Sequence, residues 1–126
     1  MATDRDREIL ALNQKLLQAA LHGDWATYAD LCCPSVSCFE AESNGQLVEG
    51  LEFHRFYFPS QPAASQNQVT MSRPHVRWLN DDAAVLSYVR LVQRLTDGQP
   101  VTQSCLETRV WQRLNNHWKL VHMHRS

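Results

Sequence analysis

Three residues in the second half of the sequence, Arg90, Glu107 and Arg109, have the types and spacing of a site for an anion. They lie on two apolar stretches separated by Asp97-Gly98, a dipeptide typical of a two-residue hairpin turn. With such a turn, Arg90 pairs with Cys105. Because side chains alternate between the two faces of a strand, Glu107 and Arg109 then share the face of Arg90.

The two guanidinium groups repel each other, so this arrangement requires a negative partner. At about 7 Å and an effective dielectric of about 20, the repulsion is about 2 kcal/mol. Glu107 can supply one internal counter-charge. Any surplus positive charge favours a guest carboxylate, which accepts two hydrogen bonds from one guanidinium. The alternative is that the arginines are solvated, or pair structurally with Glu40, Glu42 or Glu107.

A third arginine, Arg125, lies near the end of the chain. A strict two-residue turn at Asn115-Asn116 places it on the opposite face of the sheet. An odd loop or a bulge brings it to the face of Arg90 and Arg109. The strand pattern leaves both registers open.

Other side chains carry weaker chemical signals. His122 and His124 are spaced to lie on one face of a strand, as a metal pair requires, but spacing does not determine a third ligand such as His54 or His75. Hydrogen-bonded structural histidines are the favoured interpretation. We expect no metal and no other cofactor.

The four cysteines also lack a functional pattern. They include the adjacent pair Cys32-Cys33, which cannot act as a C-x-x-C pair. No local signature marks Cys38 or Cys105 as a nucleophile. We expect reduced, mostly buried thiols, in agreement with a cytoplasmic protein.

The elements that must position these residues begin with helices. Apolar residues recur every three or four positions and predict a helix over Asp4–Leu21, which His22-Gly23 ends. Asp24 can cap a second helix over residues 25–32, and Pro34 stops it.

A strand over residues 36–40 follows the helices. Asn44-Gly45 predicts a hairpin turn, with residues 46–50 returning from it. The aromatic segment 51–58 is predicted as a short helix, and the polar segment 60–68 as a loop.

The rest of the chain has β character, with strands predicted over residues 69–79, 83–95, 101–114 and 118–125. The short turn-forming separators make successive strands antiparallel neighbours. We therefore predict one α+β domain spanning residues 1–126, with N-terminal helices packed on an antiparallel sheet.

Both faces of the stretch 83–95 are apolar. One face carries Ala84, Leu86, Tyr88, Arg90 and Val92, and the other carries Val85, Ser87, Val89 and Leu91. The helices can cover only one face, so another copy of the chain is the favoured cover for the second. The alternative is a sharply curved sheet that wraps its own core.

The composition limits the remaining function classes. The 126 residues carry a formal net charge of −1, which gives no electrostatic reason to expect nucleic acid or a membrane as partner. The apolar runs are too short for a membrane-spanning helix. The charged N-terminus does not resemble a signal peptide, so we expect a cytoplasmic location.

Motifs spread over nearly the whole chain resemble one family. The most specific are Phe-His-Arg-Phe-Tyr-Phe at 53–58 and Glu-Thr-Arg-Val-Trp at 107–111, accompanied by Gly-Asp-Trp at 23–25 and by Trp-Lys-Leu-Val-His-Met-His-Arg-Ser at 118–126. These stretches resemble the association (hub) domain of calcium/calmodulin-dependent protein kinase II.

The resemblance implies a cone-shaped fold similar to nuclear transport factor 2, with a long helix resting in a curved sheet. It implies self-assembly into two stacked rings that hold kinase domains. It also implies a pocket for an acidic peptide, such as a kinase regulatory segment, or for a small carboxylate. At matching positions the pocket residues are His54, Arg90, Arg109 and Arg125, with Tyr88 and Glu107 in support. Arg125 joins this pocket only through the bulged register.

Small isomerases, dehydratases and cyclases share this fold, so an enzyme is the alternative. It would use Glu107 or His54 as general base, with Arg90 and Tyr88 stabilising an oxyanion. A carboxylate flanked by arginines has a lowered pKa and is a poor base near neutral pH. We therefore favour a non-catalytic oligomerisation module.

The sequence also departs from the family pattern. We expect neither a kinase domain nor a calmodulin-binding segment within these 126 residues, which can be a free-standing hub-like protein or an excised domain. The stretch 59–68 and the loop at Asp97-Gly98 are shorter than in the metazoan pattern. Loops can alter ring curvature, so the number of subunits does not carry over.

Overall fold

The computed structural model describes residues 2–55, 58 and 67–126. Helix α1 (Asp4–Leu21) has the predicted bounds. Thr3 begins it with a capping box, in which the Thr3 hydroxyl accepts a hydrogen bond from the Asp6 backbone and the Asp6 carboxylate accepts one from the Thr3 backbone. Gly23, with a φ of 72°, provides the left-handed turn that separates α1 from the next helix.

Helix α2 (Trp25–Leu31) is capped by Asp24, as predicted, but it ends one residue earlier than predicted. The backbone of Cys32 is already extended and begins strand β1 (Cys32–Phe39). The prediction that Pro34 stops the helix was therefore wrong, because Pro34 lies inside β1. A proline is tolerated in a strand where its missing N–H is not needed by the ladder.

The segment after β1 is less regular than a tight hairpin. A 3-10 helix, η1 (Ala41–Ser43), precedes Asn44 and Gly45, both of which have the positive φ values expected of a turn. The returning strand β2 (Val48–Glu49) pairs with β1 through only two residues. The predicted return over 46–50 is therefore shorter in the structure.

Helix α3 (Leu51–Arg55) covers the first part of the helix predicted over 51–58. Phe58 lies in a bend, and residues 56–57 are outside the described residues. Most of the loop predicted over 60–68 also falls outside the described residues. Its last residue, Gln68, belongs to a strand instead.

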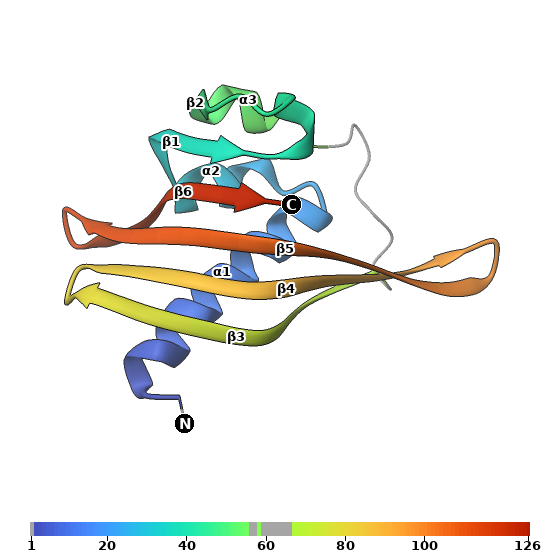
Figure 1. Cartoon of the computed structure of the whole chain (residues 1–126), viewed down its shortest axis with the longest axis horizontal. Helices are drawn as coiled ribbons and strands as arrows, with labels where there is room; N and C mark the ends of the chain where they lie inside the picture. The colour runs from blue at the N-terminus through green and yellow to red at the C-terminus, as the bar shows by residue number, and fades with distance from the viewer. Residues whose placement is uncertain (1, 56–57, 59–66) are drawn as a thin grey trace.

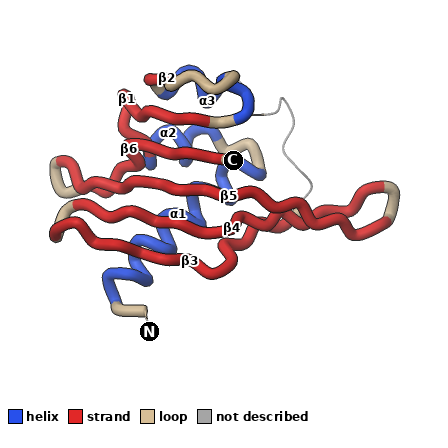
Figure 2. Tube along the Cα trace, viewed as in Figure 1, coloured by secondary structure: helices blue, strands red, loops and turns tan. Residues whose placement is uncertain are grey.

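Four long strands complete the chain: β3 (Gln68–Asn80), β4 (Ala83–Thr96), β5 (Gln99–Leu114) and β6 (His117–Arg125). They form the predicted antiparallel meander. Within the described chain the sheet has six strands in the order β2-β1-β6-β5-β4-β3 (Figure 2). Strand β1 runs parallel to β6, so the sheet is mixed and not wholly antiparallel.

Helix α1 crosses one face of the sheet, and the hairpin of β4 and β5 extends beyond the other strands as an arm (Figure 1). The core lies between α1 and this face. It includes Ile9 and Leu16 from α1, Leu86 from β4 and Trp111 from β5, all fully buried. The predicted α+β fold, with N-terminal helices on a curved sheet, is confirmed.

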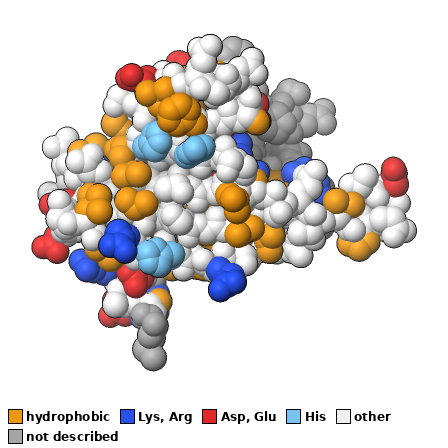
Figure 3. Space-filling view, in the orientation of Figure 1, with side chains coloured by type: hydrophobic (Ala, Val, Ile, Leu, Met, Phe, Trp, Pro, Cys, Tyr) orange, Lys and Arg blue, Asp and Glu red, His pale blue; other side chains and the backbone are white. Residues whose placement is uncertain are grey.

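The opposite face of the sheet carries a second apolar set. Val85, Val89 and Leu91 are only half-buried there, and Leu106 is 59% exposed. Apolar side chains are spread over the strands on this face in the space-filling view (Figure 3). As predicted, α1 packs on only one face of the sheet in the part of the chain that the structure describes.

None of the helices in the part of the chain that the structure describes has the length and apolar character needed to cross a membrane.

Candidate functional site

The β4–β5 ladder brings the two central arginines and their counter-charge together. Thr96 pairs with Gln99 across the Asp97-Gly98 turn, and Arg90 pairs with Cys105, as predicted. The side chains of Glu107 and Arg109 lie on the face under α1, and each residue is 2% exposed. The two-residue turn thus determines the face on which these charges lie.

Arg125 reaches the same face through an irregularity in the β5–β6 ladder. Leu114 pairs with His117 across a two-residue turn, but the register shifts between Trp111 and Val110. Beyond the shift, Glu107 pairs with Arg125. The bulged register, which the resemblance implied and the strand pattern left open, is therefore the one observed.

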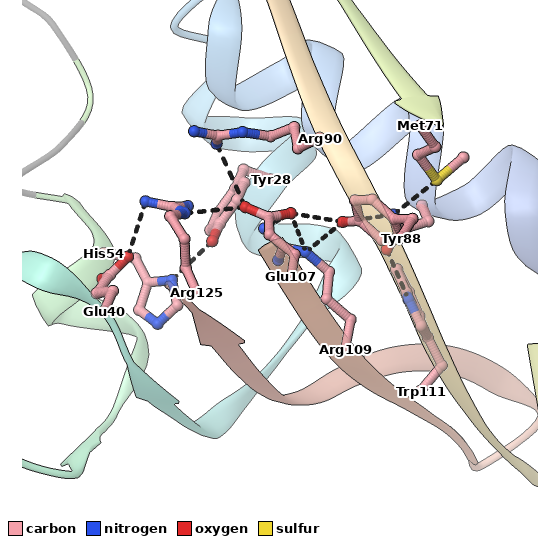
Figure 4. Close-up of polar contacts among 11 residues, drawn as sticks. Tyr28, Glu40, His54, Met71, Tyr88, Arg90, Glu107, Arg109, Trp111 and Arg125 are labelled. Carbon is pink, nitrogen blue, oxygen red and sulfur yellow. Dashed lines mark hydrogen bonds and ion pairs between the residues drawn. The ribbon is translucent and has the colours of Figure 1, made fainter. Parts of the chain in front are cut away.

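The carboxylate of Glu107 is surrounded by donors (Figure 4). Oε1 accepts from the Tyr88 hydroxyl at 2.6 Å and from Arg109 Nε at 3.2 Å. Oε2 accepts from Arg125 Nε at 2.9 Å and forms an ion pair with Arg90 Nη1 at 3.4 Å. Burial alone would raise the pKa of Glu107, but the arginines outweigh it and lower the pKa to about 2.

The direction of the Tyr88 hydroxyl is determined by its neighbours. Its oxygen accepts hydrogen bonds from Asn13 Nδ2 at 3.0 Å and from Arg109 Nε at 2.9 Å, so its proton is directed to Glu107. Asn13 is oriented in turn by Trp111 Nε1, which donates to Asn13 Oδ1 at 3.0 Å. This buried network connects α1 to the charged cluster.

A second buried carboxylate, Glu40, lies at the end of β1. Its Oε2 is 3.2 Å from Arg125 Nη1. The sequence suggested Glu40 only as one of three structural partners for the arginines, and that pairing is observed. Its proximity to Arg125 depends on the parallel pairing of β1 and β6, which joins strands far apart in the sequence.

His54 on α3 is buried beside the cluster. Its Nδ1 is 2.6 Å from the hydroxyl of Tyr28 on α2. Burial, together with the charges of Arg109 and Arg125, lowers the pKa of His54 to about 4, so the imidazole is neutral near neutral pH. Tyr28 was missed as a site residue, because the pattern of α2 shows only that it lies on the buried face.

These residues line a small cavity of about 50 Å³ under the N-terminal helices. Among the described residues, Phe58 and apolar side chains of α1 form the rest of its wall, and the polar part consists of Arg90, Arg109, Arg125, Glu40, His54 and Tyr28. The volume is enough for a few water molecules or for a carboxylate group. All four predicted pocket residues are therefore brought together, and Tyr88 and Glu107 support them.

Several nitrogen atoms at this cavity have no hydrogen-bond partner within the described part of the chain. Among the described residues, the buried unpartnered side-chain atoms include His54 Nε2, Arg90 Nε and Arg109 Nη1. When the Tyr28 hydroxyl donates to His54 Nδ1, His54 Nε2 carries a proton and all three nitrogens are donors. Three guanidinium groups also face two carboxylates. The cavity therefore has donors and positive charge in excess, which an acceptor such as a carboxylate matches.

The remaining candidates form no comparable site. His122 Nδ1 is 2.7 Å from Ser37 Oγ, as the structural interpretation predicts. The described residues hold no group of three or more potential metal ligands. All four cysteines are free, and burial raises the thiol pKa of Cys32 to about 12 and of Cys38 to about 11. Such thiols are poor nucleophiles.

Comparison with known proteins gives consistent matches. The family model of the calcium/calmodulin dependent protein kinase II association domain matches residues 5–126 of this chain. The delta subunit of this kinase from Oryctolagus cuniculus is 40% identical over 125 residues, which are 97% of this chain and 24% of that protein. The chain thus spans about a quarter of the kinase that it matches.

Two solved structures are similar over nearly their whole length. The association domain of the C. elegans kinase is 41% identical with a TM-score of 0.92, covering 97% of this chain and 95% of that one. The hub homology domain from Chlamydomonas reinhardtii is 47% identical with a TM-score of 0.89, covering 98% of both chains.

A nuclear transport factor 2-like protein from Salmonella enterica is 20% identical with a TM-score of 0.74, covering 95% of this chain and 88% of that one. This likeness shows the fold alone and confirms its expected type. The long matches at 40% identity and above show more than the fold. The chain belongs to the calcium/calmodulin-dependent protein kinase II association domain family.

Proposed function

We propose that residues 1–126 form a single hub domain that assembles copies of itself into a closed, stacked ring in the cytoplasm. Association domains of this family oligomerise and are not catalytic. The observation that supports a ring is the half-buried apolar set on the face of the sheet turned away from α1. Identical copies can cover such faces. When each copy is rotated by the same angle relative to its neighbour and the last copy meets the first, the assembly is a closed ring. The ring raises the effective concentration of whatever each copy carries or docks.

Assembly is tested by measuring the mass of the chain in solution. Multi-angle light scattering at micromolar concentration is expected to give a multiple of the 14.5 kDa chain mass. A mass equal to one chain would contradict the proposal. Native mass spectrometry then counts the subunits, a number that the fold does not provide.

We further propose that the cavity binds a carboxylate, carried by an acidic peptide such as a kinase regulatory segment or by a small molecule. The support is the excess of donors at the cavity, together with the three guanidinium groups that face two carboxylates. The side chains of Arg90 and Arg125 are 26% and 22% exposed, so a ligand from solvent can make first contact with either of them, whereas Arg109 is buried.

Calorimetric titration with sodium propionate tests the cavity. Arg90→Gln removes a guanidinium from the cavity and is expected to weaken binding by about tenfold, the size of one charge-assisted contact. Arg77→Gln is the matched control, because Arg77 is exposed on β3 and does not line the cavity. Equal affinity in the two variants would contradict the assignment of the pocket.

The alternative of an isomerase, dehydratase or cyclase requires a free general base. Glu107 is bonded by four donor side chains, and the lowered pKa makes it a weak base. His54 is neutral, and its Nε2 has no partner among the described residues, but the non-catalytic character of association domains argues against this alternative. Turnover of a small carbonyl substrate by the wild type, abolished in Glu107→Gln, would support the enzyme alternative.

A further inference from the structure

The two buried carboxylates near the cavity are held very differently. Glu107 accepts contacts from Tyr88 and three arginines. Within the described residues the Glu40 carboxylate contacts Arg125 at 3.2 Å and the Cys38 thiol at 3.7 Å. A thiol is a weak donor, so the ion pair with Arg125 is the main attachment of Glu40. The hydroxyl of Ser43 bonds to the backbone of Glu40 and not to its carboxylate.

Arg125 does not depend on Glu40 for its position. Its Nε donates to Glu107 at 2.9 Å, while its Nη1 faces Glu40 (Figure 4). If Glu40 moves away, Glu107 still holds the guanidinium at the edge of the cavity. Arg125 then presents Nη1 to whatever replaces Glu40.

The position of Glu40 is unfavourable for a carboxylate. Its side chain is 2% exposed. Burial raises the pKa of Glu40 above its ordinary value, Arg125 lowers it, and the nearby carboxylate of Glu42 raises it again. The net shift is upward, so a single ion pair does not compensate for the loss of hydration.

Glu40 also has room to leave. Besides the inner cavity, it lines an outer groove of about 440 Å³ together with Phe39, His124 and Ser126. Among the described residues, Glu40 and Arg125 are the two that line both spaces. Their ion pair therefore forms the wall between the cavity and the groove.

We propose that Glu40 is an internal competitor: in the empty site its carboxylate occupies Arg125, and a guest carboxylate binds by displacing it into the outer groove. This inference rests on the proposed function of the cavity. It adds that the affinity of the site is set by Glu40 as well as by the arginines. A guest gains Arg125 together with the unpartnered donors of Arg90, Arg109 and His54.

Titration with sodium propionate tests the displacement. Glu40→Gln keeps the shape of the side chain but removes its charge, and we expect binding to tighten by about tenfold, which corresponds to one partly buried charge pair. Glu42→Gln removes the same charge from an exposed neighbour in η1 and is expected to leave the affinity nearly unchanged.

The possible outcomes separate the two proposals. If the wild type binds propionate and Glu40→Gln binds it equally or more weakly, the proposal that Glu40 competes with the guest is wrong, while the cavity remains a binding site. If neither binds it, both proposals are wrong. Thermal unfolding monitored by circular dichroism verifies that the variant is folded.

A crystal structure of the wild-type chain soaked with propionate gives a second test that needs no variant. We expect the propionate carboxylate on Arg125 and the Glu40 side chain turned toward the outer groove. Propionate bound in the cavity beside an intact pair of Glu40 and Arg125 would overturn the proposal.

Discussion

The face of the sheet under α1 and the face turned away from it are built from the same strands but differ in their partners. Under α1, buried charges find partners within the chain, as Glu107 does with Arg109. On the other face, apolar side chains such as Val89 and Leu106 lie half-buried or exposed, and none of the described helices packs over them. A substitution on the first face should therefore affect folding, and one on the second should affect assembly.

The largest expected effect tests the covered face. Glu107→Gln leaves three arginines with one fewer counter-charge, and removal of one partner from a buried ion pair costs about 3–5 kcal/mol. The free energy of unfolding, measured in urea, should fall by this amount. Glu49→Gln, the same chemical change at an exposed position of β2, should have little effect. Equal denaturation midpoints would show that the cluster does not stabilise the fold.

The next effect is a loss of stability in acid. Because the pKa of His54 is 6.5 ordinarily and about 4 in the folded chain, the unfolded chain takes up a proton first as pH falls. The stabilising contribution is complete above pH 6.5 and is lost as pH drops toward 4. It amounts to about 3 kcal/mol at most.

Urea unfolding at a series of pH values measures this effect. His54→Gln should flatten the dependence over that interval, whereas His75→Gln, at an exposed position on β3, should not. A His54→Gln chain that loses stability in acid as steeply as the wild type would disprove the role of His54.

On the open face, Leu106→Glu should separate assembly from folding. A charge in place of an apolar interface side chain weakens association by about 2 kcal/mol or more per contact. Light scattering should show a smaller mass, while near-ultraviolet circular dichroism shows intact packing. Gln103→Glu adds the same charge to the arm but to its other face, and should keep the assembly. If both variants assemble alike, the open face is not the interface.

The smallest expected effect is at Tyr88. Tyr88→Phe removes the hydroxyl that donates to Glu107 and accepts from Asn13 and Arg109, while keeping the ring. Loss of one buried hydroxyl should cost about 1–2 kcal/mol, less than Glu107→Gln because the arginines still hold the carboxylate. A cost equal to that of Glu107→Gln would mean that the hydroxyl, and not the charge, organises the covered face.

The pattern of residues close together in the sequence was enough to predict most of the secondary structure and half of the charged cluster. The apolar period gave the bounds of α1, and the Asp97-Gly98 turn gave the pairing of Arg90 with Cys105. These features depend on residues close together in the sequence, where side-chain alternation and turn geometry are decisive. The end of α2 was predicted one residue too late, because Pro34 was taken as a helix stop although the chain was already extended at Cys32.

Tertiary structure decided the rest of the site. The register shift between Val110 and Trp111 brings Arg125 to Glu107, and the parallel pairing of β1 with β6 brings Glu40 to Arg125. A bulge and a pairing of strands some 85 residues apart cannot be recognised from the neighbouring residues in the sequence. Both depend on how the packed sheet pairs its buried charges and buries its apolar side chains. The sequence by itself therefore determined which residues could bind an anion, and the packed sheet determined which of them meet.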